Sequence, residues 1–466
     1  MTKAVSEREL VLGILLEVTR DGEYSHIALR NVLNKYQYLD KKERAFITRV
    51  TEGTLEHMIE IDYIINQFSS VKVNKMKPVI RNIVRSAVYQ LKYMDSVPNS
   101  AACNEAVKLA NRKGFSALKG FVNGVLRNIE RNLDTLTYPD EADLLKYFSV
   151  TYSMPEWILQ SWLAQYDRAT VETMLADFQK EKPTTIRCNL NHMSKAELIA
   201  ELEAEGVHVE EHPYLPYALQ ISDYDYLGDL KTFQQGAFHV QDISSMLVAH
   251  IASPKEGDYV IDVCAAPGGK ALHMAELLQG SGHVEARDLT DYKVNFIQEN
   301  ILRSGMKNIE AVRWDATVCD DRAVGKADVV IADLPCSGLG VLGKKTDLKY
   351  KMTEQTQKDL AALQRDILST VKSYVKPGGT LIYSTCTIND AENMGNVEWF
   401  LNENSDFVLT SIQDRLCDEL RAEAVDENMC RQLPSAALRD GCLQLLPGIH
   451  KSDGFFIAKF KKVNHE

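Results

Sequence analysis

The chain has 466 residues, of which 45% are hydrophobic and 25% charged, and its formal net charge is −12. This length exceeds what one hydrophobic core supports and predicts two to four domains, and the composition is that of an ordinary soluble globular protein. Apolar runs of the roughly 18 residues that a membrane-spanning helix needs are absent from the sequence, which excludes a helical membrane protein.

The first residues and the cysteines indicate the expected compartment. The start, MTKAVSEREL, lacks the apolar centre of a signal peptide, so we expect a cytoplasmic protein. The nine cysteines form no C-x-x-C pair and no His/Cys pattern. This predicts free thiols in a reducing compartment rather than a disulfide framework or a zinc site, and no metal is expected.

The charge is unevenly distributed along the chain. Between Lys72 and Arg131 there are 12 positive charges and three negative ones, whereas the chain beyond Arg131 is strongly acidic. A basic block on an acidic protein is typical of a separate module with a polyanionic partner. The alternative is a lysine-rich face that is merely solvated.

Residues 5–131 have the apolar spacing of helices throughout. Within the segment 78–94, one stripe at helical spacing consists of Ile80, Val84, Ala87 and Leu91. Arg81, Arg85 and Lys92 lie roughly 100–140° around the axis from that stripe, because each residue adds about 100°. The segment is therefore predicted to be a helix with a packed face and a basic flank.

After a hinge that contains Pro139 and Pro155, the pattern changes to strands and helices. The stretches TTIRCNL, SKAELIAELEAEG and ALQIS, between residues 183 and 230, predict strand, helix and strand. Ser194 is the expected cap of the helix and Gly206 its end. This small α/β segment has no evident chemistry of its own.

From about residue 231, short apolar strands alternate with helices. The strands are YVIDVCA, HVEARDL, IEAVRWD, ADVVIADLP and GTLIYSTC. Such alternation predicts a doubly wound, mostly parallel, Rossmann-like sheet with ligands at the carboxyl ends of its strands. We expect a multidomain protein: an all-α domain (1–135), a linker with a small α/β domain (136–230) and a Rossmann-like α/β domain (231–466).

The stretch VIDVCAAPGGKALHM, residues 260–274, predicts a strand, a glycine-bearing turn and a helix. A phosphate-binding P-loop is excluded, because Cys264 and Ala271 stand where glycine and Ser/Thr are required. The dinucleotide motif G-x-G-x-x-G is also absent. The turn therefore lacks a phosphate cradle.

Two acidic residues at later strand ends complete the predicted cofactor site. Asp288 follows Gly268 by 20 residues, the spacing at which a carboxylate accepts hydrogen bonds from ribose hydroxyls. Asp315, at the end of the next strand, is expected within reach of an adenine amino group. These features fit S-adenosylmethionine (SAM), whose sulfonium also suits an acidic surround. Each aspartate alone is a common strand-end cap.

Two cysteines follow neighbouring strands, Cys336 in ADLPCSG (332–338) and Cys386 in STCT (384–387). Carbon 5 of a pyrimidine is a poor nucleophile until a thiolate adds to carbon 6 and makes an enamine-like intermediate. Carbon 5 must then lose its proton before the thiol leaves. The pair therefore suits a nucleophile and a second group that assists release. Either cysteine alone could be a small buried hydrophobe.

Two sets of motifs resemble known families. The helical pattern with RELVLGILLEV, VPNSAACNEAVKLA and FVNGVLRNI resembles the NusB family of all-α RNA-binding domains. CAAPGGK, DLPCSG and STCT, with FHVQDISSML (238–247) and DGFFIAKF (453–460), resemble the NOL1/NOP2/Sun family of RNA cytosine-5 methyltransferases. Together they resemble its bacterial RsmB (Sun) branch, which methylates small-subunit (16S) rRNA.

The resemblance implies roles for particular residues. Cys386 would be the nucleophile and Cys336 the residue that helps to release product, with Asp333 at the cytosine edge and near the methionine part of SAM. The implied cofactor residues are Cys264, Ala265, Ala266, Pro267, Gly268, Gly269 and Lys270, with Asp288, Asp315 and Asp333. The implied partner is 16S rRNA, free or in an early assembly intermediate, and the protein is expected to be a monomer without membrane contact.

One segment departs from the family, and three alternatives stay open. The family often shows Arg-Arg-x-Pro-Asp after the first cysteine loop, where this chain has GKKTDLKY (343–350). Lys344 and Lys345 keep the charge without bidentate recognition of phosphate, so RNA contact by this segment stays open. The alternatives are a tRNA cytosine-5 methyltransferase, a non-catalytic RNA-binding assembly factor, and an antitermination factor, which would explain only the first 131 residues.

Overall fold

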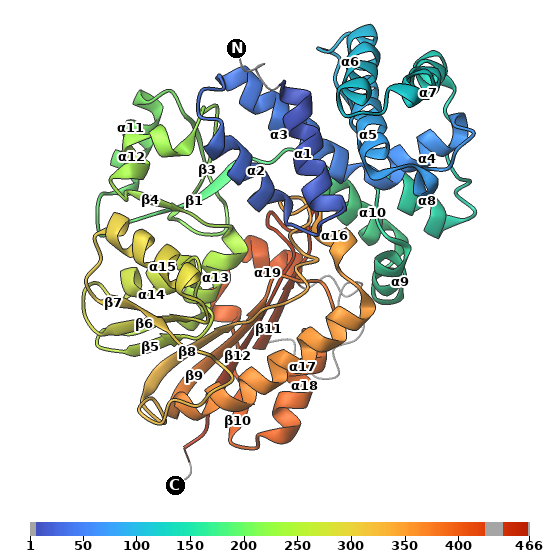
Figure 1. The fold of residues 1–466 in the computed structure, drawn as a ribbon. Coiled ribbons are helices and arrows are strands. Elements are labelled where there is room, and N and C mark those ends of the chain that lie inside the picture. The colour runs from blue at the N-terminus through green and yellow to red at the C-terminus, as the bar shows by residue number, and fades with distance from the viewer. Residues whose placement is uncertain (1–5, 425–440, 465–466) are drawn as a thin grey trace. The chain divides into compact units, whose positions relative to one another are not determined.

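The structure, a computed structural model, describes residues 6–424 and 441–464 (Figure 1). Its contacts divide the chain into two compact units. One unit holds Met1–Gln179 with Leu342–Thr353, and the other holds Lys180–Val341 with Glu354–Glu466. Within the described ranges, no helix is both long and apolar enough to span a membrane.

The first unit is helical throughout its described residues (Figure 1). Its helices are α1 (Glu7–Thr19), α2 (Ser25–Lys35), α3 (Lys41–Glu56), α4 (Met58–Phe68), α5 (Pro78–Tyr93), α6 (Asn99–Arg112), α7 (Lys119–Arg131), α8 (Leu144–Thr151), α9 (Glu156–Gln165), α10 (Arg168–Phe178) and α16 (Leu348–Lys351), with short 3-10 turns η1 (Val73–Lys75), η2 (Ser116–Leu118) and η3 (Leu133–Thr135). Each helix from α1 through α7 contributes buried residues to one hydrophobic core. The predicted all-α domain is confirmed.

Helix α5 runs through that core and begins with proline at its first position, where the missing N–H costs nothing. Its predicted apolar stripe is buried. The predicted basic flank is wrong for Arg85, and Lys92 is half-buried. Arg85 is itself buried and pairs with Asp62 at 2.6 Å, and Lys92 pairs with Glu60. A helix surrounded by other helices buries more than one stripe, so these cations need carboxylate partners.

The segment after the first cysteine loop packs into the helical unit. Asp347 is 1% exposed and accepts hydrogen bonds from the backbone N–H and the hydroxyl of Ser25, at 3.1 and 2.6 Å. Lys349 donates to the carbonyl of Glu56 at 2.9 Å, and burial lowers its pKa to about 8. These residues of GKKTDLKY thus serve packing, whereas Lys344 and Lys345 are exposed.

The second unit begins with a small antiparallel sheet of order β2-β3-β1-β4. Its elements are β1 (Thr184–Cys188), α11 (Lys195–Ala204), β2 (His208–Glu211), β3 (Ala218–Ser222), η4 (Leu227–Asp229), α12 (Lys231–Gln234) and β4 (Phe238–Val240). Ser194 caps α11 in a capping box with Glu197, and Gly206 follows with a φ of +84°. The predicted strand, helix and strand are confirmed.

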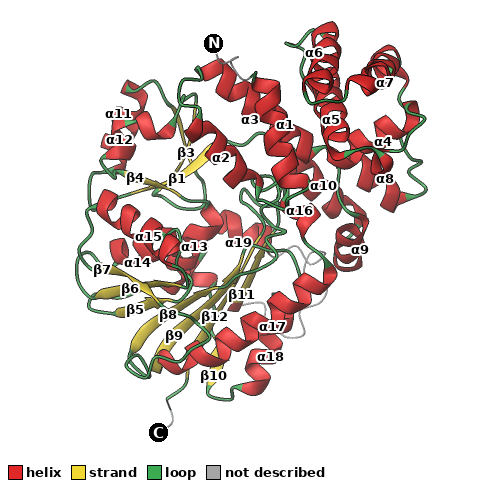
Figure 2. Cartoon of the chain, viewed as in Figure 1, coloured by secondary structure: helices red, strands yellow, loops and turns green. Residues whose placement is uncertain are grey.

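The large sheet of the second unit has the order β10-β12-β9-β8-β5-β6-β7, with β11 paired to β12 (Figure 2). Its strands are β5 (Tyr259–Asp262), β6 (His283–Asp288), β7 (Ile309–Arg313), β8 (Ala327–Asp333), β9 (Val375–Thr385), β10 (Phe407–Leu409), β11 (Cys442–Leu445) and β12 (Phe455–Lys462), and its helices and turns are α13 (Ile243–Ala252), α14 (Gly269–Leu277), α15 (Asp291–Ser304), α17 (Glu354–Val371), η5 (Lys372–Tyr374), α18 (Met394–Glu403), η6 (Gln413–Arg415) and α19 (Asp418–Ala424). β5 to β9 are parallel and β10 to β12 antiparallel.

Alternate residues of the central strands enter two separate cores, because successive side chains of a strand point to opposite faces. Val329 and Ile331 pack with α13, α14 and α15, whereas Val330 packs with α17 and α18 on the other face. The predicted doubly wound, mostly parallel sheet is therefore confirmed.

The strand register brings three carboxyl ends together. β8 lies between β5 and β9, with Asp262 aligned to Ile331 and Asp333 aligned to Ser384. The loops that leave these three strands hold the glycine turn and both predicted catalytic cysteines.

Candidate active site

The predicted cofactor turn lies between β5 and α14. Gly268 caps the helix with a φ of +107°, which a residue with a side chain rarely adopts, and its N–H donates to the carbonyl of Ala265 at 2.6 Å. The carbonyl of Pro267 accepts from Asn300 of α15 at 2.9 Å. The turn is therefore held from within and from a neighbouring helix.

Asp288, at the end of β6, holds the same turn. One carboxylate oxygen accepts the N–H of Ala266 at 3.0 Å, the other accepts the N–H of Leu289 at 2.8 Å, and Lys293 pairs with it at 3.1 Å. Asp288 is 4% exposed. Each carboxylate oxygen has two acceptor sites, so Oδ2, which accepts the N–H of Ala266, keeps one acceptor site for the hydroxyl of a ligand.

Asp315 lies two residues beyond the end of β7 rather than at the strand end. It is exposed, and one of its oxygens accepts from the N–H and the hydroxyl of Thr317 at 2.9 and 2.7 Å. These hydrogen bonds lower the pKa of Asp315 and fix its carboxylate as an anion. No described contact joins it to the other predicted site residues.

Asp262, which the sequence reasoning missed, lies at the centre of the site. It ends β5, is fully buried, and its Oδ2 has no hydrogen-bond partner among the described residues. Burial, with the nearby charge of Asp333, raises its pKa to about 8. The sequence feature that could have identified Asp262 is its position at the end of a predicted strand, just before the glycine turn.

Lys270 and Asp333 form an ion pair beside Asp262. Lys270 Nζ lies 2.7 Å from Asp333 Oδ2, and Ser384 donates to Asp333 Oδ1 at 2.8 Å. Burial lowers the pKa of Lys270, but Asp333, Asp262 and Cys386 raise it, and the net direction is upward. A cation is thus held where a thiolate would form.

The two cysteines are brought together as predicted. The sulfur atoms of Cys336 and Cys386 lie 3.3 Å apart, and both are free thiols. The hydrogen bond with Cys386, together with burial, raises the pKa of Cys336 well above its usual value.

A buried carboxylate ties the two cysteine loops together. Glu392 accepts from the N–H of Ser337 at 2.8 Å, from Asn389 at 2.8 Å and from Gln364 of α17 at 3.0 Å. The hydroxyls of Ser337 and Thr387 lie 2.7 Å apart. The sequence reasoning missed this network, although the run NDAEN after STCT was its signal.

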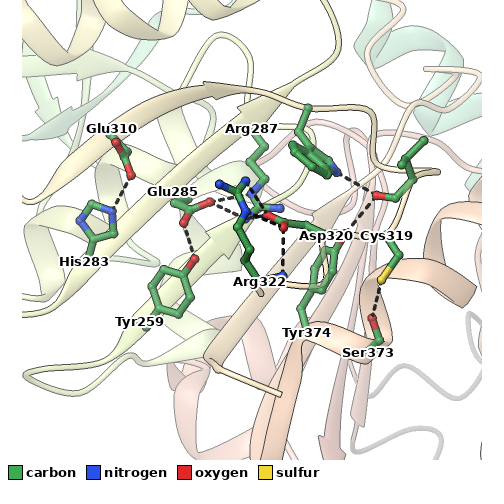
Figure 3. Close-up of polar contacts among 12 residues, drawn as sticks. Tyr259, His283, Glu285, Arg287, Glu310, Cys319, Asp320, Arg322, Ser373 and Tyr374 are labelled. Carbon is green, nitrogen blue, oxygen red and sulfur yellow. Dashed lines mark hydrogen bonds and ion pairs between the residues drawn. The ribbon is translucent and has the colours of Figure 1, made fainter. Parts of the chain in front are cut away.

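The flank of the same sheet holds an ionic network (Figure 3). Arg287 bonds Glu285 and Asp320, and Glu285 also accepts from Tyr259. Among the described residues, one group has ligand atoms close enough to hold a metal ion, His283, Glu285 and Glu310. Glu285 is also paired with Arg287, which is 2% exposed, so the ionic network extends from the exposed Glu310 into the buried part of the sheet.

A mostly parallel sheet with a glycine turn after its central strand defines a Rossmann-like α/β enzyme, here with two thiols at neighbouring strand ends. The family model "16S rRNA methyltransferase RsmB/F" matches residues 249–461, the NusB family matches 5–131, and the RsmF/B-like ferredoxin-like domain matches 154–224.

Relatives match the chain from end to end. The probable ribosomal RNA small subunit methyltransferase B of Bacillus subtilis is 34% identical, with 99% of both chains covered, and its Synechocystis counterpart is 32% identical, with 98% and 100% covered. The crystal structure of PH0851 superposes with a TM-score of 0.79 at 25% identity and 98% coverage of both chains. The chain belongs to the RsmB/F family of 16S rRNA methyltransferases.

Proposed function

We propose that the protein transfers a methyl group from SAM to carbon 5 of a cytosine in 16S rRNA, through a covalent bond between Cys386 and the base. It acts in the cytoplasm as a monomer, and the thiol chemistry requires no metal. The observation that carries the proposal is the pair of sulfurs 3.3 Å apart, beside the Lys270–Asp333 ion pair.

The residues around the turn fit SAM. The buried, unpartnered Oδ2 of Asp262 offers an acceptor to the ammonium group of the cofactor, and Asp288 offers one to the ribose. The 264–270 turn would pass beneath the methionine part, with Asp315 nearer the adenine. When bound, SAM supplies the electrophilic methyl group.

Lys270 and the two sulfurs divide the chemistry. Lys270 stabilises Cys386 as a thiolate, and Cys386 Sγ adds to carbon 6 so that the electron pair becomes available at carbon 5. After methylation the sulfur of Cys336, as a thiolate, takes up the carbon-5 proton. The electron pair of that C–H bond re-forms the double bond between carbons 5 and 6 as the bond from carbon 6 to Cys386 breaks. Cys336, at 3.3 Å, assists this release, while Asp333 orients the cytosine edge.

The test is a denaturing gel of wild type, Cys386→Ala and Cys336→Ala with SAM and labelled 16S rRNA. Cys386→Ala should abolish methylation and any covalent adduct, whereas Cys336→Ala should methylate, release slowly and accumulate an adduct. Because the base must leave its stack to meet a thiol, a loop cytosine is the expected target.

The exposed cysteine variant Cys319→Ala is the matched control and should behave as wild type. An adduct in Cys386→Ala but not in Cys336→Ala would reverse the two roles. Methylation of tRNA but not of 16S rRNA by the wild type would reject the proposed substrate.

A further inference from the structure

The helical unit contains a cavity of about 220 Å³, several times the roughly 30 Å³ of a water molecule. Its walls come from α1, α3, α4, α5 and the segment 347–351, all within that unit. The polar side chains on its walls are Thr19, Arg81, Arg85, Asp347, Tyr350 and Lys351. Three of them are cations.

Two of the three cations are neutralised by carboxylates. Arg85 binds Asp62 with two nitrogens, at 2.7 and 2.6 Å. Lys351 lies 3.1 Å from Asp347, and it also donates to backbone carbonyls of the loop before α2. Neither cation needs a further anion.

Arg81 has no such partner. No ion pair or side-chain hydrogen bond involves it among the described residues, and its Nε is buried without an acceptor. Burial lowers its pKa, the neighbouring charge of Arg85 lowers it further, and Asp62, which is already paired with Arg85, raises it without reversing the downward direction. The cavity therefore has one positive charge without a paired carboxylate. Because a buried donor without an acceptor costs free energy, Arg81 makes the folded protein less stable while the cavity is empty.

We propose that this cavity binds a phosphodiester group of the RNA substrate on Arg81. One excess positive charge matches the single negative charge of a phosphodiester. The guanidinium fork suits two phosphate oxygens, and a protein carboxylate is the less favoured occupant. The wall segment 347–351 directly follows Lys344, Lys345 and Thr346, the residues that depart from the family pattern, and it contributes Asp347, Tyr350 and Lys351 to the cavity wall.

The choice of RNA rests on the proposed function and on the charge around the cavity. α5 lies in the block from Lys72 to Arg131, with 12 positive charges against three negative ones. Phosphate contacts dominate the affinity of such surfaces and hold the nucleic acid in register. An anion-binding site within this block would orient the bound RNA.

The experiment compares full-length wild type, Arg81→Gln and Arg81→Lys for binding to a 16S rRNA transcript at several salt concentrations. Arg81→Gln should bind about ten-fold more weakly, and its slope of log affinity against log salt should fall by roughly 0.7–0.9. Arg81→Lys should lie between the two, because the charge stays but the fork is lost. Inorganic phosphate should raise the melting temperature of wild type above that in chloride of equal ionic strength, and this gain should vanish in Arg81→Gln.

The matched control is Arg168→Gln, which removes an exposed arginine of α10 whose ion pair with Glu141 is at the surface. Its RNA affinity should stay within about two-fold of wild type. An equal loss in both variants would mean diffuse electrostatics and overturn the site. Lost phosphate stabilisation with unchanged RNA affinity would assign the cavity to a small phosphate ligand and overturn the RNA assignment. Methyl transfer at saturating RNA is measured in a separate assay. If wild type transferred no methyl group, the proposed methyltransferase function would be rejected, but the proposed phosphate site at Arg81 would not.

Discussion

Asp262 at the end of β5 and Asp333 at the end of β8 lower the free energy of unfolding of the protein while no ligand is bound to the candidate active site. Asp262 is buried with one oxygen unpartnered, and Lys270 and Asp333 share an ion pair next to it. A buried carboxylate without full hydrogen bonding favours its neutral form. Such groups are typical of functional sites, where ligand contacts later satisfy them.

Asp262→Asn should change how stability depends on pH. The pKa of Asp262 is about 8 in the folded protein and 3.8 as its ordinary value, so folding takes up a proton between these pH values. Wild type therefore loses stability from this group as pH rises from about 4 to 8. The asparagine variant lacks that loss and should be more stable at pH 8 by roughly 1–3 kcal/mol.

Urea unfolding of cofactor-free protein at several pH values measures this difference. Asp291→Asn, which changes an exposed aspartate of α15, is the control and should follow the wild-type curve. A constant difference between Asp262→Asn and wild type across this pH range would show that Asp262 is ionised throughout.

At the scale of elements, three loops meet backbone to backbone behind the sulfurs. The N–H of Gly340 donates to the carbonyl of Cys386 at 3.0 Å, and its carbonyl accepts from the N–H of Gly454 at 2.9 Å. A Cβ on Gly340 would lie 2.0 Å from the carbonyl oxygen of Gly454. The distance between the sulfurs therefore depends on glycine at position 340.

Gly340→Ala should separate the two cysteine loops while leaving the fold intact. Overpacking of this kind costs roughly 1–3 kcal/mol, and a displacement of about 1 Å at a reacting group lowers rates by about 100-fold. Single-turnover methylation and the rate of diamide-induced disulfide formation between Cys336 and Cys386 should both fall.

Gly13→Ala is the contrasting variant, because no atom lies within 4 Å of its Cβ on α1. It should keep full activity and gain about 0.5–1 kcal/mol of stability from helix propensity. Wild-type rates in Gly340→Ala would mean that the loops adjust without moving the sulfurs.

At the scale of the whole molecule, a basic helical unit is combined with an acidic catalytic unit. The chain leaves the catalytic unit at Val341, packs 342–353 into the helical unit and returns at Glu354. Deleting the first 131 residues would expose the buried Asp347 and Lys349. Because truncation would also disturb the segment 342–353, we test RNA binding by the helical unit with charge substitutions instead.

The triple variant Lys75→Gln, Lys119→Gln and Arg131→Gln removes three exposed cations of the basic block. Each phosphate contact releases counterions, so the slope of log RNA affinity against log salt should fall by up to roughly 2–3. SAM affinity, measured by calorimetry, should stay unchanged. An unaltered salt slope would identify the block as a solvated face.

Local patterns in the sequence were enough to predict the helices and strands and to bring the candidate site residues to attention. Strand and helix periodicity, the cap at Ser194 and the glycine turn depend on residues close together in the chain, and the helices, strands, cap and turn predicted from them are confirmed. The pairing of Cys336 with Cys386 also followed, because both end neighbouring parallel strands, whose carboxyl ends meet at one edge of the sheet.

Only the tertiary structure decided which charges are satisfied. Arg81, Arg85 and Lys92 are alike in the sequence, but Asp62 and Glu60 of another helix neutralise the last two and leave Arg81 alone. In the same way, the burial of Asp347 depends on Ser25, 322 positions away. Burial and ion pairing arise between residues distant along the chain, so the periodicity of one segment carries no information about them.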